Sequence, residues 1–478
     1  MATTATPNLR ENKMKTMPVG RLLLTMALPL VISMLVQAFY NIVDTYFVSM
    51  VSTDATGALS FAFPIQNLQI GFSTGIAVGV NSLLSKSLGE NNRERANLAA
   101  GNGIVLMVIS VALFVLFGAF GTKFYYSLFD VSETTRQFGI DYTSICCIFT
   151  LGIFVEILGE RLLQASGRTV YTLFTQGVGA VINIILDPVF IMGSAGLEGR
   201  FGIKLPFDLP AYGVAGAAIA TVVGQWVAGI MAVIFNITKN PDVKFGLKYL
   251  KLDKYVVGKI LSVGVPSIVM MCIGAVMNFC MNQVFLRFTP THGQTPANVF
   301  GIYFKLQSLF LMPLFGINNA TISILAYNYG ARMPKRITGT LKCALLTDLV
   351  IMLIGVAVFQ LLPDKLMGIF GSSGDESATA LISMGVTAMR IVCLHFPIAA
   401  VGISLGASFQ ALGNGIYSTI TSLCRQLFAL LPAAYLLSLT GSVDAVWWSF
   451  PIAEIVSATV SLTLFRRIYR MKIRPLAD

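Results

Sequence analysis

Apolar runs of twenty or more residues recur along the whole chain and are separated by short polar segments. Each run is long enough for a helix to cross a hydrocarbon core of about 30 Å. The runs are continuous, which excludes the alternating pattern of a transmembrane β-barrel. The pattern predicts an all-α membrane protein with twelve spans, near residues 20–48, 56–85, 98–121, 136–159, 168–193, 211–236, 257–286, 298–325, 340–362, 380–405, 415–439 and 444–468.

Composition agrees with this pattern. Of the 478 residues, 55% are hydrophobic and 12% are charged, whereas soluble domains carry about 25% charged residues. The first residues, MATTATPNLRENKMKT, lack the apolar region of a signal peptide, so we expect the first span to stay in the membrane. The seven cysteines all fall in apolar runs, where we expect small core residues rather than disulfides or metal ligands.

The basic residues predict the orientation. Twelve spans place both termini on one side, and the loops and tails of that side hold 24 of the 33 Lys and Arg residues, against 6 on the other side. Lys and Arg accumulate on the cytoplasmic side of membrane proteins. We therefore expect both termini in the cytoplasm, and the net charge of +11 reflects topology rather than nucleic-acid binding.

An internal repeat divides the chain into two halves. Its landmarks recur in the same order in both halves: Pro29 with Pro266, Gln66 with Gln307, Gly89 with Gly330, Arg95 with Arg336, and LLQASGRTVY (162–171) with SFQALGNGIY (408–417). Six spans per half make the repeat parallel, with a pseudo-two-fold axis along the membrane normal. The predicted units are a cytoplasmic arm (1–19), an N-lobe (20–236), a cytoplasmic linker (237–256), a C-lobe (257–468) and a cytoplasmic tail (469–478).

Two like-oriented six-helix bundles that face each other are typical of a transporter with a central cavity. The sequence has no GxxxxGK[ST] loop for ATP, no HExxH motif and only two histidines, so we do not expect an enzyme. An intramembrane enzyme or receptor is an alternative against which the repeat argues. A flippase for lipid-linked saccharides is the nearer alternative, although three basic residues inside spans are few for a pyrophosphate cargo.

Two carboxylates of the first half lie at similar depth inside outward-running spans. Asp44 lies 22 residues after Leu22 in a span that runs outward, and Asp187 lies at a similar depth in span five. A charge at the centre of a bilayer costs roughly 3 kcal/mol, so each one needs a reason. Polar side chains at this depth complete a candidate cation-coupling site, namely Tyr40, Asn41, Asp141, Tyr142, Asn183 and Thr221.

The second half keeps the scaffold and loses the acids, which supports a functional role. Asp44 aligns with Met281, and Asp187 aligns with Leu431. Carboxylates that share a low-dielectric site bind a proton, or they coordinate Na⁺ together with carbonyl and hydroxyl oxygens. We expect H⁺ or Na⁺ here without a choice between them, and the predicted Na⁺ ligands are Asp44, Asn183, Asp187 and Thr221.

Other charges inside spans have structural and functional interpretations. Glu156 and Glu160 are expected near the cytoplasmic end, paired with Arg161, and His395 is expected to be a hydrogen-bonded core residue. Three basic residues, Lys305, Arg390 and Arg425, either pair with Asp348 and Glu454 or line a cavity that favours acidic, zwitterionic or polar cargo. The candidate cargo-cavity residues are Gln37, Gln66, Asn278, Asn282, Lys305 and Gln307.

Several motifs occur in order along essentially the whole chain: ALP, NIVDTYFV, SLGENNRERA, LLQASGR, NIILDPVFI and GVAGAAIATVVGQ. With the two parallel halves, they resemble the MATE (multidrug and toxic compound extrusion) transporters, and among these the bacterial and archaeal members with an N-lobe ion site. The resemblance implies a V-shaped, two-lobe fold and bending at Pro29. It assigns the coupling site to Tyr40, Asp44, Tyr142, Asn183, Asp187 and Thr221. Span seven departs from the subclass with second-lobe acids, since it offers Asn278 and Asn282.

The prediction is a secondary active antiporter of the cytoplasmic (inner) membrane that exports drugs, dyes or metabolites in exchange for H⁺ or Na⁺ by alternating access. We expect no cofactor besides the coupling ion, and no nucleic-acid partner. The expected partners are the small-molecule cargo and membrane lipids, and a monomer suffices because twelve spans enclose their own cavity. A dedicated exporter of one endogenous natural product stays open as an alternative.

Overall fold

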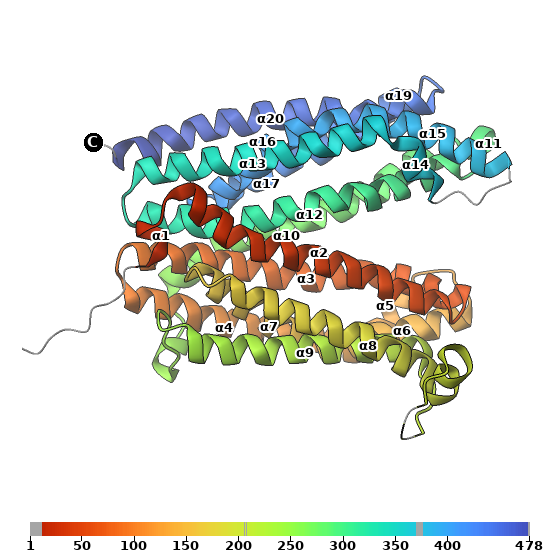
Figure 1. The fold of residues 1–478 in the computed structure, drawn as a ribbon, viewed down its shortest axis with the longest axis horizontal. Coiled ribbons are helices and arrows are strands. Elements are labelled where there is room, and N and C mark those ends of the chain that lie inside the picture. The colour runs from red at the N-terminus through yellow and green to blue at the C-terminus, as the bar shows by residue number, and fades with distance from the viewer. Residues whose placement is uncertain (1–11, 205, 207, 370–375, 477–478) are drawn as a thin grey trace, which may run out of the picture.

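The fold consists of helices laid roughly along one axis (Figure 1). The computed structural model describes residues 12–204, 206, 208–369 and 376–476, and every regular element within them is a helix. The main helices of the first half are α2 (Val19–Ser49), α3 (Thr53–Gly89), α4 (Arg93–Leu116), α6 (Glu133–Ile148), α7 (Leu151–Ala165), α8 (Val170–Phe201) and α9 (Gly213–Lys239). Those of the second half are α10 (Lys254–Leu286), α12 (Thr295–Gly330), α13 (Pro334–Leu361), α15 (Glu376–Val392), α16 (Phe396–Ala411), α17 (Gly415–Leu423), α18 (Leu431–Ser438) and α20 (Ser449–Ile468).

Short elements connect or extend these helices. They are α1 (Lys13–Thr16), α5 (Thr122–Ser127), α11 (Thr289–His292), α14 (Pro363–Gly368), α19 (Val443–Trp447) and the π-helical turns η1 (Phe117–Gly121), η4 (Cys424–Leu430) and η5 (Tyr469–Ile473). Side-chain caps begin several helices: Ser52 accepts a hydrogen bond from the backbone of Ala55, and Ser132 from that of Thr135. Such caps pair backbone N–H groups that have no partner inside the helix.

The membrane fold predicted from the apolar runs is confirmed. Within the described residues, eleven helices are long and apolar enough to cross a membrane, and the number is twelve if the bent pair α6 and α7 counts as one span. The predicted span 136–159 is broken between Ile148 and Leu151, where the two helices meet at 47°. At the break the carbonyl of Phe149 accepts a hydrogen bond from the indole of Trp226 at 3.1 Å, which compensates for the interrupted helix.

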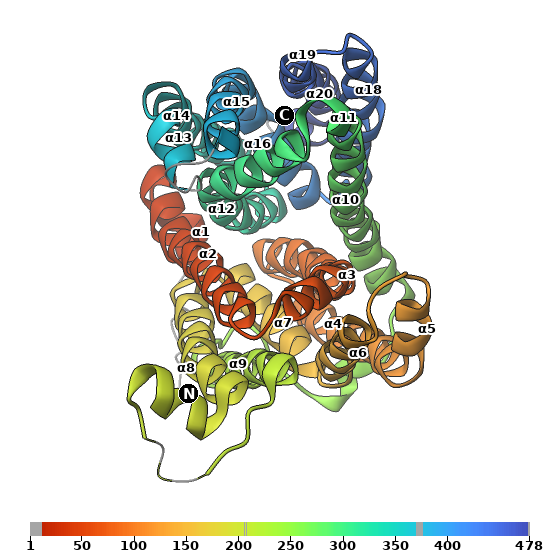
Figure 2. The ribbon, with the colours of Figure 1, turned by 90° about the vertical axis from the view of Figure 1, so that its right-hand side faces the viewer.

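The two halves form two lobes, and the first helix of each half also packs on the other lobe (Figures 1 and 2). Helix α2 contacts α8 of its own lobe and α12 of the other, while α10 contacts α17 of its own lobe and α3 of the other. Because α2 and α10 are equivalent in the repeat, as are α3 and α12, the same interface is built twice. The lobe boundaries drawn from the sequence stay a prediction.

Glycines bring the lobes together at the end of the molecule where α1 lies and α20 ends (Figure 1). A Cβ atom on Gly89 of α3 would collide with the carbonyl oxygen of Tyr327 in α12, and one on Gly330 would collide with that of Lys86 in α3. Gly316 of α12 packs in the same way on the backbone of Val31 in α2. We call this end the closed end.

Toward the opposite end of the molecule, which we call the open end, the facing surfaces of the two lobes separate. Lys305 precedes Gly316 by eleven residues, or about three turns, and so projects from the same side of α12. Val31 covers Gly316, whereas Lys305 is exposed and Leu309, between them, is 45% exposed. The side of α12 that the N-lobe covers near the closed end is thus uncovered near the open end.

The N-terminal arm lies across both lobes at the closed end. The guanidinium Nη2 of Arg336, in α13 of the C-lobe, donates hydrogen bonds to the carbonyls of Met14 (2.9 Å) and Met17 (2.7 Å). On the N-lobe side, the amide of Asn12 donates to the carbonyl of Ser166 at 3.5 Å. The side chain of Met14 is fully buried in an apolar cluster that both lobes share.

Candidate functional site

Helix α8 carries a polar stripe through the interior of the N-lobe. Asp187, Asn183 and Gln176 follow one another at spacings of four and seven residues and so lie on one side of the helix. Two small residues, Gly179 and Ala180, lie between them and line a cavity. The stripe therefore consists of two polar ends with room between them.

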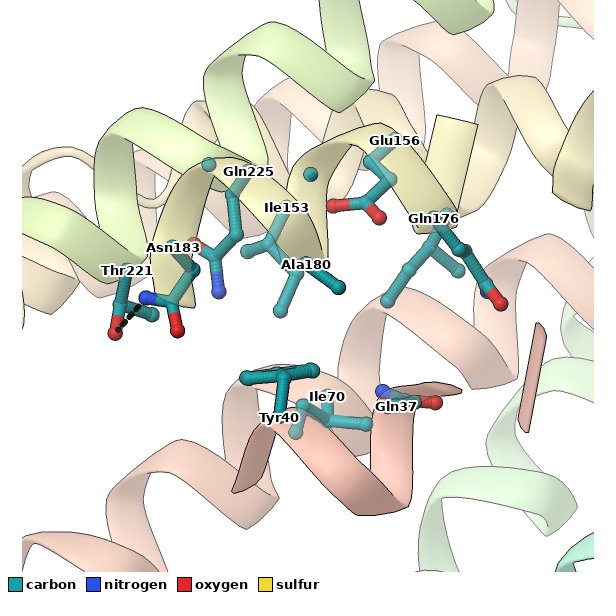
Figure 3. A pocket seen from close by; sticks show the side chains of 13 residues that line it. Gln37, Tyr40, Ile70, Ile153, Glu156, Gln176, Ala180, Asn183, Thr221 and Gln225 are labelled. Carbon is teal, nitrogen blue, oxygen red and sulfur yellow. Dashed lines mark hydrogen bonds between the residues drawn. The ribbon is translucent and has the colours of Figure 1, made fainter. Parts of the chain in front are cut away.

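Asp187, Asn183 and Thr221 form the polar end nearer the open end of the molecule. Asp187 is fully buried, and Asn183 is 3% exposed. The amide nitrogen of Asn183 lies 3.2 Å from the hydroxyl of Thr221 on α9 (Figure 3). With the amide turned by 180°, it donates to Oδ2 of Asp187 at 3.2 Å and accepts from the hydroxyl and the backbone N–H of Thr221.

Asp44 reaches the same region from α2. It interacts electrostatically with Asp187, Tyr142 and Tyr40, so four of the predicted site residues share one electrostatic neighbourhood. Its Oδ1 atom is buried and has no hydrogen-bond partner among the described residues. This orphaned oxygen leaves a position for a cation or a proton beside Asp187.

Tyr142 is held in place by Gln66. Tyr142, on α6, is 2% exposed, and its hydroxyl accepts a hydrogen bond from the amide of Gln66, on α3, at 3.0 Å. Gln66, which we predicted as a cargo-cavity residue, therefore positions a residue of the predicted coupling site. The bond also ties α3 to α6 beside Asp44.

The structure does not bring Asp141 into this cluster. Its carboxylate accepts a hydrogen bond from Gln137, one turn earlier on α6, at 2.8 Å and near the surface. Neighbouring helical residues project about 100° apart, so Tyr142 points inward and Asp141 does not. The side chain of Asn41 lies outside the described residues.

A cavity adjoins the cluster and separates the two polar ends of α8 (Figure 3). Its wall combines residues of α2, α3, α7, α8 and α9, namely Gln37, Tyr40, Ile70, Ile153, Glu156, Ile157, Gln176, Gly179, Ala180, Asn183, Thr221, Gly224 and Gln225. The predicted residues Gln37, Tyr40, Asn183 and Thr221 thus meet in one space. Its wall combines apolar side chains with polar groups that could orient a bound ligand.

Sequence reasoning missed Glu156, Gln176 and Gln225 in this wall. Glu156 was expected near the cytoplasmic end beside Arg161, but Arg161 instead donates to Gln164 at 3.1 Å and Glu156 faces the cavity. The predicted span ended at residue 159, whereas α7 continues to Ala165, which places Glu156 deeper. Gln176 could have been found from the spacing of the polar residues Gln176, Asn183 and Asp187 along α8.

All side chains that can bind a cation in this cluster offer oxygen. The described residues contain no group of three or more His, Cys, Asp or Glu that could hold a metal ion. Two carboxylates with amide, hydroxyl and phenol oxygens fit a proton or a hard monovalent cation such as Na⁺, and they do not fit a soft transition metal. The candidate Na⁺ ligands Asp44, Asn183, Asp187 and Thr221 lie in this one region.

The C-lobe residues divide into a buried and a more exposed group. Gln307 is buried, and its amide nitrogen lies 3.3 Å from Nε2 of His395, as expected of a core histidine. Lys305 and Asn282 are exposed, and Asn278 is half-buried. Arg425 lies 3.7 Å from Glu454, and Ser404 donates to Asp348 at 2.6 Å, so both acids have local partners.

Pro29 lies inside the helical stretch of α2, which runs unbroken through it. The residue is buried near the closed end, and its carbonyl accepts a hydrogen bond from Ser33 at 2.9 Å. A proline inside a helix lacks the N–H that would donate to the preceding turn. The predicted hinge thus lacks one backbone hydrogen bond of the helix, which makes bending easier, in a helix that is continuous here.

Comparison with known proteins decides the family. The family described as MatE matches this chain twice, over residues 29–189 and 266–436. The chain is a member of the MatE family. The two matched segments begin at Pro29 and Pro266, the residues that mark the first helix of each half, and so agree with the repeat. This is a family of membrane transporters for efflux, and the present chain is a multi-pass MATE transporter.

Relatives and solved structures cover nearly the whole chain. An FAD transporter from Shewanella oneidensis is 25% identical over 451 residues, which are 94% of this chain and 95% of that protein. The multidrug export protein MepA from Staphylococcus haemolyticus is 23% identical over 95% of this chain and 94% of its own length. The crystal structure of a MATE protein in complex with MaL6 superposes with a TM-score of 0.88 at 22% identity, over 98% of this chain and 99% of the other. The predicted two-lobe fold is therefore confirmed.

Proposed function

We propose that this MATE transporter is a cation-coupled antiporter whose coupling ion, H⁺ or Na⁺, binds at Asp44 and Asp187. The observation that carries the proposal is the pairing of a fully buried carboxylate with a second carboxylate that has an orphaned oxygen. No basic side chain of the described residues forms an ion pair with either. Two acids inside a membrane without a basic partner are stabilised by a bound cation.

Alternating access follows from the two ends of the lobe interface. The closed end carries the termini, which the basic-residue count assigns to the cytoplasm. With that orientation, the state proposed for this arrangement is closed to the cytoplasm and open to the outside. In this state the cation enters from outside. Because it binds one state more tightly than the other, it shifts the balance between them and drives cargo out. The localisation that fits is the cytoplasmic membrane, with both termini inside.

The cargo is a small organic molecule such as a drug, dye or metabolite. The wall of the N-lobe cavity offers both apolar side chains and polar groups to such a molecule. Exposed Lys305 on the cleft side of α12 favours acidic, zwitterionic or polar molecules over purely cationic ones. Among relatives, one is named an FAD transporter and others are named multidrug export proteins, so export of a single endogenous compound is the second candidate.

The partners that fit this function are the cargo and membrane lipids, and the transporter works as a monomer without a cofactor other than the coupling ion. A lipid-linked saccharide flippase fits less well. Arg425 already faces Glu454, which leaves Lys305 and Arg390 to hold a pyrophosphate group.

Purified proteoliposomes test the proposal. Release of preloaded dyes, cationic in one set and anionic in another, is measured after a pH gradient is imposed and, separately, a Na⁺ gradient. We expect one gradient to drive release by the wild type and not by Asp44→Asn. If Asp44→Asn released dye at the wild-type rate under the same gradient, the proposal would be contradicted.

A further inference from the structure

Glu156 is a carboxylate inside the membrane that the coupling site does not use. It lies on α7, on the wall of the N-lobe cavity away from Asn183 and Thr221 (Figure 3). Within the described residues its carboxylate forms no hydrogen bond or ion pair, and it faces open space. A carboxylate in this position has a reason beyond packing, because an unpaired charge in a membrane interior is costly.

Its neighbour Glu160, one turn later on α7, shows what a structural carboxylate looks like here. Glu160 is 4% exposed and accepts hydrogen bonds from the hydroxyl of Thr175 (2.7 Å) and the amide of Gln176 (2.8 Å). It also interacts favourably with Arg161. Glu160 is thus compensated, whereas Glu156 interacts unfavourably with Glu160 and has no such partners. A cation bound at Glu156 would supply the missing partner and reduce the repulsion from Glu160.

The cavity between Glu156 and the coupling site is lined by small and amide-bearing residues. Gly179 and Ala180 contribute small residues to its wall, and Gln37 and Gln225 contribute amides. The amide nitrogen of Gln176 is bonded to Glu160, while its Oε1 atom is buried and has no partner among the described residues. The oxygens available to a cation therefore continue along α8 from Asp187 for about 16 Å toward the closed end, at 1.5 Å per residue.

We propose that Glu156 is a second cation-binding carboxylate of the N-lobe, which receives the coupling cation from the Asp44 and Asp187 site through this cavity. The inference rests on the proposed antiport and adds a second cation-binding position, nearer the closed end. If the cation is a proton, an O–H bond at Asp187 breaks and an O–H bond at Glu156 forms, and nothing is oxidised or reduced. If it is Na⁺, the ion exchanges one set of oxygen ligands for another.

The charged and titratable groups around Glu156 are few. Helix α7 contributes Glu160 and Arg161, and α2 contributes Tyr40, which interacts electrostatically with Glu156. The residues that line the cavity from α3, α8 and α9 are neutral. A signal from this cavity can therefore be assigned to Glu156 by removing it and keeping Glu160.

Infrared difference spectra of the purified full-length protein, without cargo, test the inference. One arm changes pH in the absence of Na⁺, and the other adds Na⁺ at fixed pH, so that the arms identify the ion. The variants are Glu156→Gln, the conservative Glu156→Asp, Asp187→Asn and, as a surface control, Glu133→Gln. Thermal unfolding and gel filtration show that each variant folds.

We expect carboxylate bands from two sites in the wild type. Glu156→Gln loses one of them and keeps the band that Asp187→Asn loses, Glu156→Asp retains a shifted band, and Glu133→Gln matches the wild type. In proteoliposomes Glu156→Gln slows gradient-driven release about tenfold or more, and Glu156→Asp recovers part of it. A Glu156→Gln spectrum identical to the wild type would overturn the proposed cation binding at Glu156. An unchanged Asp187→Asn spectrum would overturn the proposed coupling site itself.

Discussion

Gly89 and Gly330 occupy equivalent positions in the two halves, and each makes room for a backbone carbonyl of the opposite lobe. The contact occurs where α3 and α12 cross at the closed end. The two close contacts are related by the pseudo-two-fold axis. One glycine position, duplicated in the repeat, therefore lets the two lobes pack closely from both sides.

Adding a methyl group at this contact should open it. We expect Gly330→Ala to destabilise the closed end by about 1–3 kcal/mol, the usual cost of overpacking, because the Cβ would collide with the backbone of Lys86. Spin-label distances between the lobes and the unfolding temperature measure the effect. The control is Gly258→Ala on α10, where a Cβ meets nothing within 4 Å. Equal behaviour of the two variants would contradict the sealing role.

The arm at the closed end should depend on Arg336. Arg336→Gln removes hydrogen bonds to Met14 and Met17 worth about 1.5–3 kcal/mol each, since the donor is charged. We expect faster trypsin cleavage after Lys13 and Lys15, followed by mass spectrometry. The matched control is Arg95→Gln, the repeat equivalent, which pairs with Glu90 inside its own lobe. Equally slow cleavage in both variants would show that the arm is held by other contacts.

The hydrogen bond between Gln66 and Tyr142 should be required for a stable coupling site. Tyr142→Phe removes the acceptor of the half-buried Gln66 amide, at a cost of about 1 kcal/mol. The double variant Gln66→Leu with Tyr142→Phe should recover part of this loss, because neither polar group is then left unpaired. Thermal unfolding of Tyr142→Phe, Gln66→Leu and the double variant measures the coupling between the two side chains. Additive losses would mean that the two side chains act independently.

The bend predicted at Pro29 can be tested in the same way. Pro29→Ala restores an N–H that can donate to the preceding turn, which favours straight α2 by about 3 kcal/mol. We expect a higher unfolding temperature and slower gradient-driven release, because the straight state is held. Pro266→Ala in α10 is the repeat-related control. A release rate equal to the wild type would remove Pro29 from the transport cycle.

The sequence predicted the number of spans, the repeat and which polar residues of the N-lobe lie close together, because these depend on apolar run length, spacing and depth along a helix. Asp44, Asp187, Asn183 and Thr221 were found by depth alone, and the structure places them together. The direction in which a side chain projects was harder. Asp141 has the right depth and points to the surface, where Gln137 binds it.

Helix ends were the other source of error. The break between α6 and α7, and the extension of α7 to Ala165, depend on tertiary contacts such as that of Trp226 with Phe149, which no local pattern reports. Glu156 was therefore placed too near the membrane surface. Its role in the cavity became visible only when α2, α7, α8 and α9 were seen around the same space (Figure 3).

The central claim, that a cation bound at the buried acids drives export, is tested most directly by comparing Asp187→Asn with Asp141→Asn. Both variants remove one carboxylate of the N-lobe at a similar depth, but only Asp187 lies in the cluster with Asn183 and Thr221. Gradient-driven dye release from proteoliposomes is the measurement. The account predicts that Asp187→Asn abolishes release while Asp141→Asn retains the wild-type rate. Wild-type release by Asp187→Asn, or loss of release in both variants, would contradict it.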